Sequence, residues 1–121
     1  MLEGHCHCGA VSVRVPRRPR ELTNCNCSIC RRYGTLWAYY QAAEVTVDAE
    51  PGATHEYVWG DRMLKFERCA HCGCVVCWRR IVPGGSGRMG VNARNFDPAL
   101  IGPARIRLLD GADTWKFLDP E

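Results

Sequence analysis

The residues with the greatest capacity for chemistry are nine cysteines, an odd number that excludes a complete set of internal disulfides. Cys-x-Cys and Cys-x-x-Cys spacings bring sulfur atoms within reach of one metal ion, whereas disulfides across such short loops would be strained. The spacing therefore favours metal binding, with redox dithiol chemistry as the alternative. The cysteines fall into three groups along the chain: Cys6 and Cys8; Cys25, Cys27 and Cys30; Cys69, Cys72, Cys74 and Cys77.

The first and third groups predict a closed, structural zinc site. Cys6-His7-Cys8-Gly9 and Cys69-Ala70-His71-Cys72-Gly73 each end in glycine, which can adopt a positive φ and direct backbone N–H groups toward the sulfur atoms. Four thiolates complete a tetrahedral zinc site. Such a site would join the first strand to the middle of the chain, and structural zinc binding can contribute about 10–16 kcal/mol to folding.

The second group predicts a different kind of metal site. Cys25-Asn26-Cys27-Ser28-Ile29-Cys30 supplies three sulfur atoms within six residues and leaves a fourth tetrahedral position unassigned. Three protein ligands with an open position are typical of catalytic zinc. Two alternatives remain: Cys74, Cys77 or a histidine completes a second closed site, or the cluster holds no stable metal.

The remaining candidate residues are expected to be structural. Cys74 and Cys77 lie in an apolar stretch and are interpreted as small buried hydrophobes. The four histidines are interpreted as surface or supporting residues, not as ligands or general bases. Core positions are expected for aromatic residues, namely the four tryptophans, Tyr39, Tyr40 and Tyr57.

Short apolar stretches between frequent turn signals predict a β-rich domain. A short helix is expected over residues 29–33, ended by Gly34. The stretch 83–87, rich in glycine, is expected to be a flexible loop. Strands are expected at residues 11–15, 36–40, 45–47, 57–59, 64–66, 74–78, 106–108 and 115–117.

Length and charge narrow the classes of protein. The 121 residues predict a single domain over residues 1–121, and no apolar run is long enough for a membrane span. Met1–His5 does not resemble a secretory signal, so a reducing, cytoplasmic location is expected. Seven thiolates and two zinc ions would cancel the formal charge of +3, which leaves little case for a nucleic-acid partner.

The order of these motifs resembles the glutathione-dependent formaldehyde-activating enzyme family, which includes centromere protein V. Two extra cysteines, Cys74 and Cys77, and the bulky stretch Asp61-Arg62-Met63 depart from the family pattern. The matching stretches span nearly the whole chain: residues 4–11, residues 25–34, Phe66-Glu67-Arg68 with the second cysteine pair, and residues 90–98.

The resemblance implies a β-tent fold of small antiparallel sheets. It also implies structural zinc on Cys6, Cys8, Cys69 and Cys72, and a second, more labile zinc, whose site can be partly occupied, on Cys25, Cys27 and Cys30. The implied activity is that of a carbon–sulfur lyase acting on thiol–aldehyde adducts of the S-hydroxymethylglutathione type, with glutathione and an aldehyde as partners. A zinc-scaffolded binding module without turnover is the alternative.

Arg31 and Arg32 follow the last cysteine of the second group directly. Three cysteinates give a zinc site a net negative charge, which these arginines would offset. Alternatively they would bind the carboxylates of a thiol such as glutathione, or remain solvated on a short helix.

Overall fold

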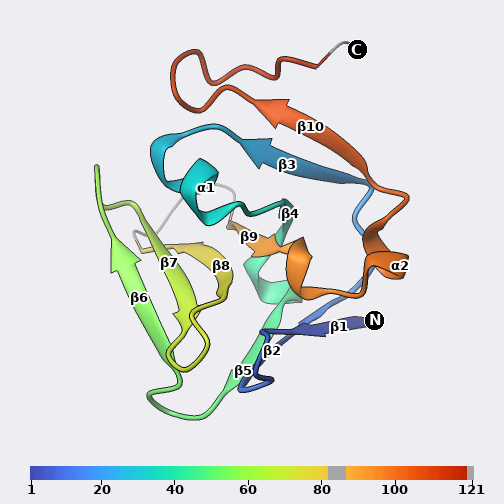
Figure 1. The fold of residues 1–121 in the computed structure, drawn as a ribbon, viewed down its shortest axis with the longest axis vertical. Helices are drawn as coiled ribbons and strands as arrows, with labels where there is room; N and C mark the ends of the chain where they lie inside the picture. Colours follow the sequence, from blue (N-terminus) through green and yellow to red (C-terminus); the bar gives the residue numbers. More distant parts are fainter. Residues whose placement is uncertain (82–86, 120–121) are drawn as a thin grey trace.

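Two β-sheets form the described part of the chain, residues 1–81 and 87–119 of a computed structural model (Figure 1). The smaller sheet has the order β1-β2-β5, with strands at Leu2–His5, Val11–Val15 and Thr46–Ala49. The larger sheet has the order β10-β3-β4-β9-β8-β7-β6. Its strands, in chain order, are β3 Glu21–Cys25, β4 Trp37–Gln41, β6 Thr54–Val58, β7 Leu64–Cys69, β8 Val75–Arg80, β9 Arg88–Asn92 and β10 Arg105–Leu109.

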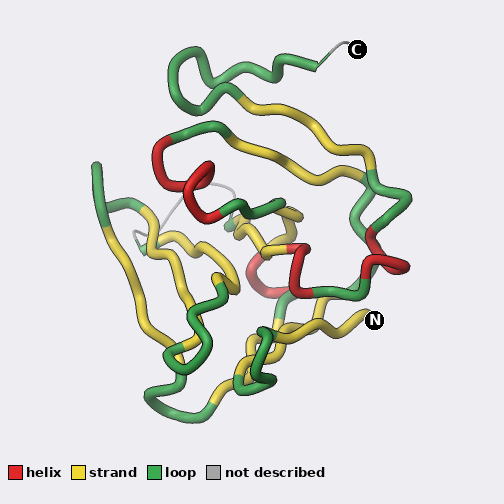
Figure 2. The backbone as a smooth tube through the Cα atoms, viewed as in Figure 1, coloured by secondary structure: helices red, strands yellow, loops and turns green. Residues whose placement is uncertain are grey.

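The helices are short and lie between strands (Figure 2). They are α1 Ser28–Tyr33, α2 Pro98–Ile101 and the 3₁₀ turns η1 Ala42–Glu44 and η2 Ala93–Asn95. Within residues 1–81 and 87–119, no helix has the length and apolar character that a membrane span requires.

Alternation of side chains explains the smaller sheet. Val11, Val13 and Val15 are buried, and the residues between them are partly exposed, so β2 presents one apolar face to the core. β2 pairs antiparallel with both β1 and β5, which places it in the centre of the sheet. The predicted strand over residues 11–15 is confirmed.

The helix prediction is also confirmed. α1 begins at Ser28 and is followed by Gly34, whose φ of 67° lies in the left-handed region. The Gly34 N–H donates to the carbonyl oxygen of Cys30, as expected for a glycine that ends a helix. A six-residue helix therefore turns the chain sharply between β3 and β4.

The fold is mainly β, as the sequence predicts, but its larger sheet is mixed. β10 pairs parallel with β3, from Arg105 beside Glu21 to Leu109 beside Cys25, whereas the other pairs are antiparallel. Figure 1 shows β6 and β7 on one side of the molecule and β3 and β10 on the other, with α1 between them.

Two expectations for the last third of the chain, at residues 115–117 and 83–87, have different outcomes. The predicted strand at 115–117 is wrong: these residues are irregular and follow a turn over residues 111–114, with a single bridge between Leu109 and Phe117. Asp110 causes this turn, because its carbonyl oxygen accepts a hydrogen bond from Trp115 N–H and its carboxylate accepts from Thr114. The glycine-rich loop expected at 83–87 lies outside the described residues except for Gly87.

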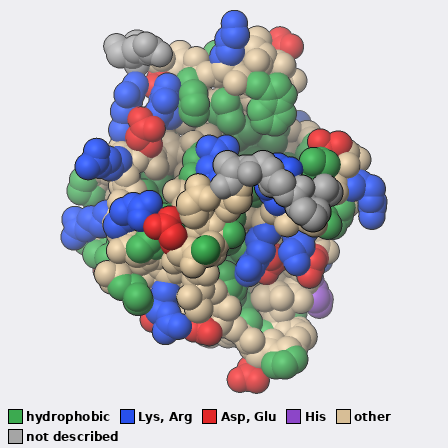
Figure 3. Space-filling model, turned by 180° about the vertical axis from the view of Figure 1, so that it is seen from behind, with side chains coloured by type: hydrophobic (Ala, Val, Ile, Leu, Met, Phe, Trp, Pro, Cys, Tyr) green, Lys and Arg blue, Asp and Glu red, His purple; other side chains and the backbone are tan. Residues whose placement is uncertain are grey.

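The aromatic residues divide between core and surface. Trp37 and Tyr40 are buried, as expected. Core positions are wrong for Tyr57, Trp59 and Trp115, which are 47%, 40% and 67% exposed. From behind Figure 1, basic and acidic side chains are interspersed over the surface (Figure 3).

Candidate functional site

The four-cysteine cluster, Cys6, Cys8, Cys69 and Cys72, brings four sulfur atoms within 4.8 Å of one another. Cys8 Sγ lies 3.7 Å from Cys6 Sγ and 3.6 Å from Cys69 Sγ. A tetrahedral zinc ion with Zn–S bonds of about 2.3 Å requires sulfur–sulfur edges of about 3.8 Å. The donor set and its dimensions therefore fit a closed metal site.

This cluster joins the two sheets. Cys6 and Cys8 lie in the turn between β1 and β2 of the smaller sheet, and Cys69 and Cys72 lie at the turn between β7 and β8 of the larger one. Cysteines 61 residues apart in the chain thus meet, with sulfur atoms in contact across the sheets. A metal ion here would hold the sheets together.

Backbone N–H groups donate hydrogen bonds to sulfur atoms of the four-cysteine cluster. Val11 N–H donates to Cys6 Sγ at 3.3 Å, and His71 N–H donates to Cys69 Sγ at 3.4 Å. Hydrogen bonds from the backbone at Cys74 and Cys8 lower the pKa of Cys72 to about 5. These backbone groups stabilise the thiolates of Cys69 and Cys72, the form that binds metal, by lowering the pKa of both residues.

The three-cysteine cluster, Cys25, Cys27 and Cys30, also has its sulfur atoms within 4.8 Å of one another. Cys25 is the last residue of β3, Cys27 is the N-cap of α1 and Cys30 lies within α1. Cys27 Sγ accepts a hydrogen bond from Cys30 N–H at 3.5 Å, and Cys30 Sγ accepts one from Trp37 Nε1 at 3.3 Å. One strand-to-helix turn therefore positions all three ligands.

The three thiols are electrostatically linked. A hydrogen bond from the Cys30 thiol, aided by the backbone at Cys27 and Gly111 and opposed by burial, lowers the pKa of Cys25 to about 6. The same bond to Cys25, together with burial, raises the pKa of Cys30. Three sulfur atoms this close cannot all ionise without a cation between them, so the cluster has the chemistry of a metal site.

No fourth His, Cys, Asp or Glu ligand joins the three-cysteine cluster within the described residues. Cys74 and Cys77 also lie outside both clusters; Cys77 is completely buried and Cys74 packs against the apolar core. The two cysteines therefore pack as small hydrophobes. None of the four histidines belongs to either cluster.

Hydrogen bonds hold a C-terminal segment, residues 110–119, against the three-cysteine cluster. Asn26 Nδ2 donates to Asp110 Oδ1 at 3.1 Å, and Asn26 Oδ1 accepts from Ala112 N–H at 3.0 Å. Between them lies buried Gly111, where an added Cβ would approach Cys25 Sγ to 2.5 Å and Cys27 Cβ to 3.2 Å. Only glycine leaves the cysteines in place here.

Gly111→Ala is expected to weaken metal binding at the three-cysteine cluster by about 10- to 100-fold, because the new methyl group must displace Cys25. Chelator competition measures the affinity. Ala112→Ser is the matched control, since it adds one atom at a neighbouring exposed position. Unchanged metal affinity in Gly111→Ala would contradict this assignment.

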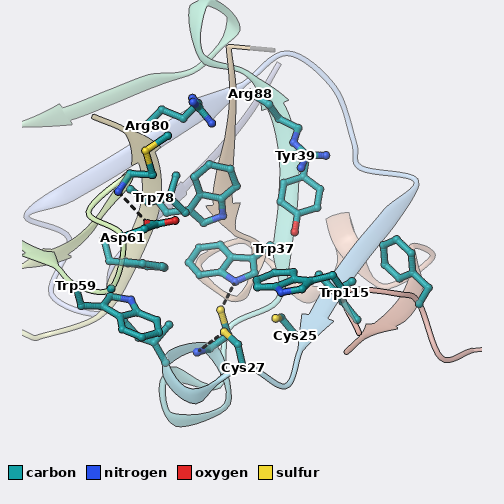
Figure 4. A pocket seen from close by; sticks show the side chains of 18 residues that line it. Cys25, Cys27, Trp37, Tyr39, Trp59, Asp61, Trp78, Arg80, Arg88 and Trp115 are labelled. Atoms are coloured by element: carbon teal, nitrogen blue, oxygen red, sulfur yellow. Dashed lines mark hydrogen bonds between the residues drawn. The ribbon is translucent and has the colours of Figure 1, made fainter. Parts of the chain in front are cut away.

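The three-cysteine cluster opens onto a cavity of about 750 Å³, whereas the four-cysteine cluster does not line it. The volume lies within the range of small-molecule sites, roughly 300–1,000 Å³. Figure 4 shows Cys25 and Cys27 at one end of the cavity and Arg80 and Arg88 at the other. The two arginines and the sulfur atoms therefore lie at opposite ends of the cavity.

Arg31 and Arg32 are exposed on α1, and neither lines the cavity. Arg32 instead donates to the carbonyl oxygen of Ser28 at 2.8 Å. The arginines at the cavity are Arg80, in β8, and Arg88, in β9. Sequence reasoning missed them because nothing in their local sequence marks them as neighbours of the cysteines; only the pairing of β8 and β9 with the rest of the sheet does.

Comparisons with known proteins agree with this arrangement. The family model "Glutathione-dependent formaldehyde-activating enzyme" matches residues 1–105. A Halomonas elongata protein named "Putative glutathione-dependent formaldehyde-activating enzyme" is 41% identical over 56 residues, which cover 46% of this chain and 34% of that protein, so the match spans about a third of the relative's length.

A crystal structure of a Rhodobacter sphaeroides protein has a similar fold, with a TM-score of 0.71 and 27% sequence identity. The similarity covers 87% of this chain and 99% of that one. With the family model matching most of its length, including both cysteine clusters, this chain belongs to the glutathione-dependent formaldehyde-activating enzyme family.

Proposed function

We propose that this protein, as a single domain over residues 1–121, is a zinc-dependent carbon–sulfur lyase-like enzyme acting on thiol–aldehyde adducts of the S-hydroxymethylglutathione type. In the synthetic direction a thiolate adds to the aldehyde carbon, a C–S bond forms, and the former carbonyl oxygen takes a proton. The observation that carries the proposal is that the three-cysteine cluster lines a cavity of small-molecule size and has no fourth ligand among the described residues.

Zinc suits both clusters, because sulfur-only donor sets favour this metal. Cys6, Cys8, Cys69 and Cys72 would hold the structural ion, and Cys25, Cys27 and Cys30 the second, more weakly held one. At the second cluster zinc would supply Lewis acidity and lower the pKa of a thiol. We also propose a cytoplasmic location, since all nine cysteines are free and a reducing compartment keeps them so.

The chain's own groups bind and orient the reactants. Trp37 Nε1–H and the backbone N–H of Cys30 hold two of the sulfur atoms in place. Arg80 and Arg88 offer guanidinium groups to the carboxylates of glutathione, and Asp61 is the single acidic side chain among the described lining residues, suited to an ammonium group. Orientation in one cavity is the contribution we assign to the protein.

A binding module without turnover is the second candidate. The observation in its favour is that no histidine lines the cavity within the described residues, so the general base that enzymes use most often does not face the reactants. Such a module would capture a thiol at the three-cysteine cluster and release it unchanged.

Exchange kinetics test the choice between the two functions. We expect zinc-loaded protein to accelerate the exchange of formaldehyde with glutathione, measured by NMR exchange spectroscopy, in proportion to protein concentration. A chelator that removes the more weakly held zinc should return the rate to that of the uncatalysed reaction. If zinc-loaded protein leaves the exchange rate unchanged, the enzyme proposal fails and the binding module replaces it.

A further inference from the structure

Aromatic rings contribute seven of the 18 described residues that line the cavity beside the three-cysteine cluster. All four tryptophans of the chain line it: Trp37, Trp59, Trp78 and Trp115. Figure 4 shows Trp59 and Trp115 on opposite sides, with Trp37 and Trp78 between them. In an adduct of formaldehyde the sulfur carries a single carbon, and this substituent is too small to cover walls of this kind.

The rings extend from the sulfur atoms toward the arginines. Trp37, hydrogen-bonded to Cys30, packs against Phe66 with ring centroids 6.2 Å apart. Tyr39 meets Trp78 edge-on at 6.0 Å, and the Arg88 guanidinium lies 4.3 Å from the centre of the Tyr39 ring. A flat apolar group can therefore pack against rings along most of the cavity.

One glycine makes this wall possible. Gly90 of β9 pairs with Trp78 of β8, and an added Cβ at Gly90 would lie 2.1 Å from Trp78 Nε1. The indole thus lies directly against the neighbouring strand, where no other residue leaves room for it. Gly90 in β9 therefore allows the Trp78 ring to lie where it lines the cavity.

Two of the tryptophans are exposed to solvent, which forgoes the free energy that burial of their rings would contribute. Trp115 is 67% exposed and Trp59 is 40% exposed, although burying such a ring is worth more than burying most side chains. Trp115 also has a φ of 60°, in the left-handed region that side chains other than glycine seldom adopt. Trp115 lies beyond residues 1–105, the stretch that the family model matches, and it lines the cavity.

The far end of the cavity supplies positive charge. Arg80 and Arg88 both line it, and they are the two cationic side chains among its described lining residues. A carboxylate is the acceptor that matches a guanidinium group in charge and shape.

We propose that the cavity binds thiol conjugates whose sulfur carries an aromatic group, with the ring between Trp59 and Trp115 and the carboxylates of the thiol at Arg80 and Arg88. The preferred adducts are therefore those of aromatic aldehydes and a carboxylate-bearing thiol. This inference rests on the proposed function for its substrate class, but the binding it describes does not require turnover.

Binding of stable conjugates tests it. We expect S-benzylglutathione to bind the zinc-loaded protein at least about tenfold more tightly than S-methylglutathione, measured by calorimetry, because the ring gains aromatic contacts. Trp115→Ala should remove most of this preference. The substitution leaves the backbone strain at this position unchanged, since alanine would adopt the same left-handed φ that tryptophan already has.

Tyr57→Ala is the matched control, because Tyr57 is 47% exposed and does not line the cavity. It should keep the preference for the benzyl conjugate. Equal affinities for the two conjugates in the unmodified protein, or a preference that survives in Trp115→Ala, would overturn the inference. Failure of the proposed function would instead appear in the exchange assay, with the binding preference intact.

Discussion

Cys6→Ser is expected to yield protein that does not fold, the largest effect on stability that we predict. Cys6 is buried in the turn between β1 and β2 and contributes one of four sulfur atoms that join the two sheets. Loss of a structural zinc site removes about 10–16 kcal/mol, as much as the whole stability of a typical domain. Circular dichroism and zinc content of the purified variant measure the outcome.

Cys74→Ser provides the control for Cys6→Ser. Cys74 lies two residues after Cys72 but belongs to neither cluster, and it is only partly buried. Its exchange for serine should leave the fold and the zinc content nearly unchanged. A folded Cys6→Ser protein with two zinc ions would refute the structural role of the four-cysteine cluster.

Cys27→Ser is expected to abolish the acceleration of thiol–aldehyde exchange and to leave the fold intact. Serine is a favoured N-cap, so it can replace the hydrogen bond that Cys27 Sγ accepts from Cys30 N–H at the start of α1. Serine is a much poorer zinc ligand than cysteine, and we expect the affinity of the three-cysteine cluster for zinc to fall by at least about 100-fold. Exchange rates and metal stoichiometry are the measurements.

Ser28→Ala is the control for Cys27→Ser. Ser28 is exposed at the first position of α1 and does not line the cavity. Its removal should leave exchange and zinc content unaltered. Full exchange activity in Cys27→Ser would show that the chemistry takes place elsewhere.

The sequence predicts the fold where periodicity and turn residues act locally. Alternation identifies the strand over Val11–Val15, and Gly34 marks the end of α1. β1, β3 and β9 are missed because their short sequences lack a clear alternation. The parallel pairing of β10 with β3 joins segments about 80 residues apart, and no local pattern encodes it.

The candidate site is predicted only where its residues are close in the chain. The two cysteine clusters assemble from the residues that the spacing indicates, because short turns determine where the sulfur atoms lie. Gly111 and Trp115 are different, since the Asn26–Asp110 hydrogen bond brings them over the cluster from the other end of the chain. Trp115 is interpreted as core from its side chain alone, whereas the turn at Asp110 leaves it exposed at the cavity.

The most direct test of the account is the near-ultraviolet and visible absorption spectrum of the cobalt-substituted protein during titration with glutathione. If the three-cysteine cluster holds a metal with one position open to a thiol, glutathione should increase the sulfur-to-cobalt charge-transfer absorption until it saturates. Cys27→Ser should show no such increase. A spectrum that does not change at saturating glutathione in the unmodified protein would contradict the account.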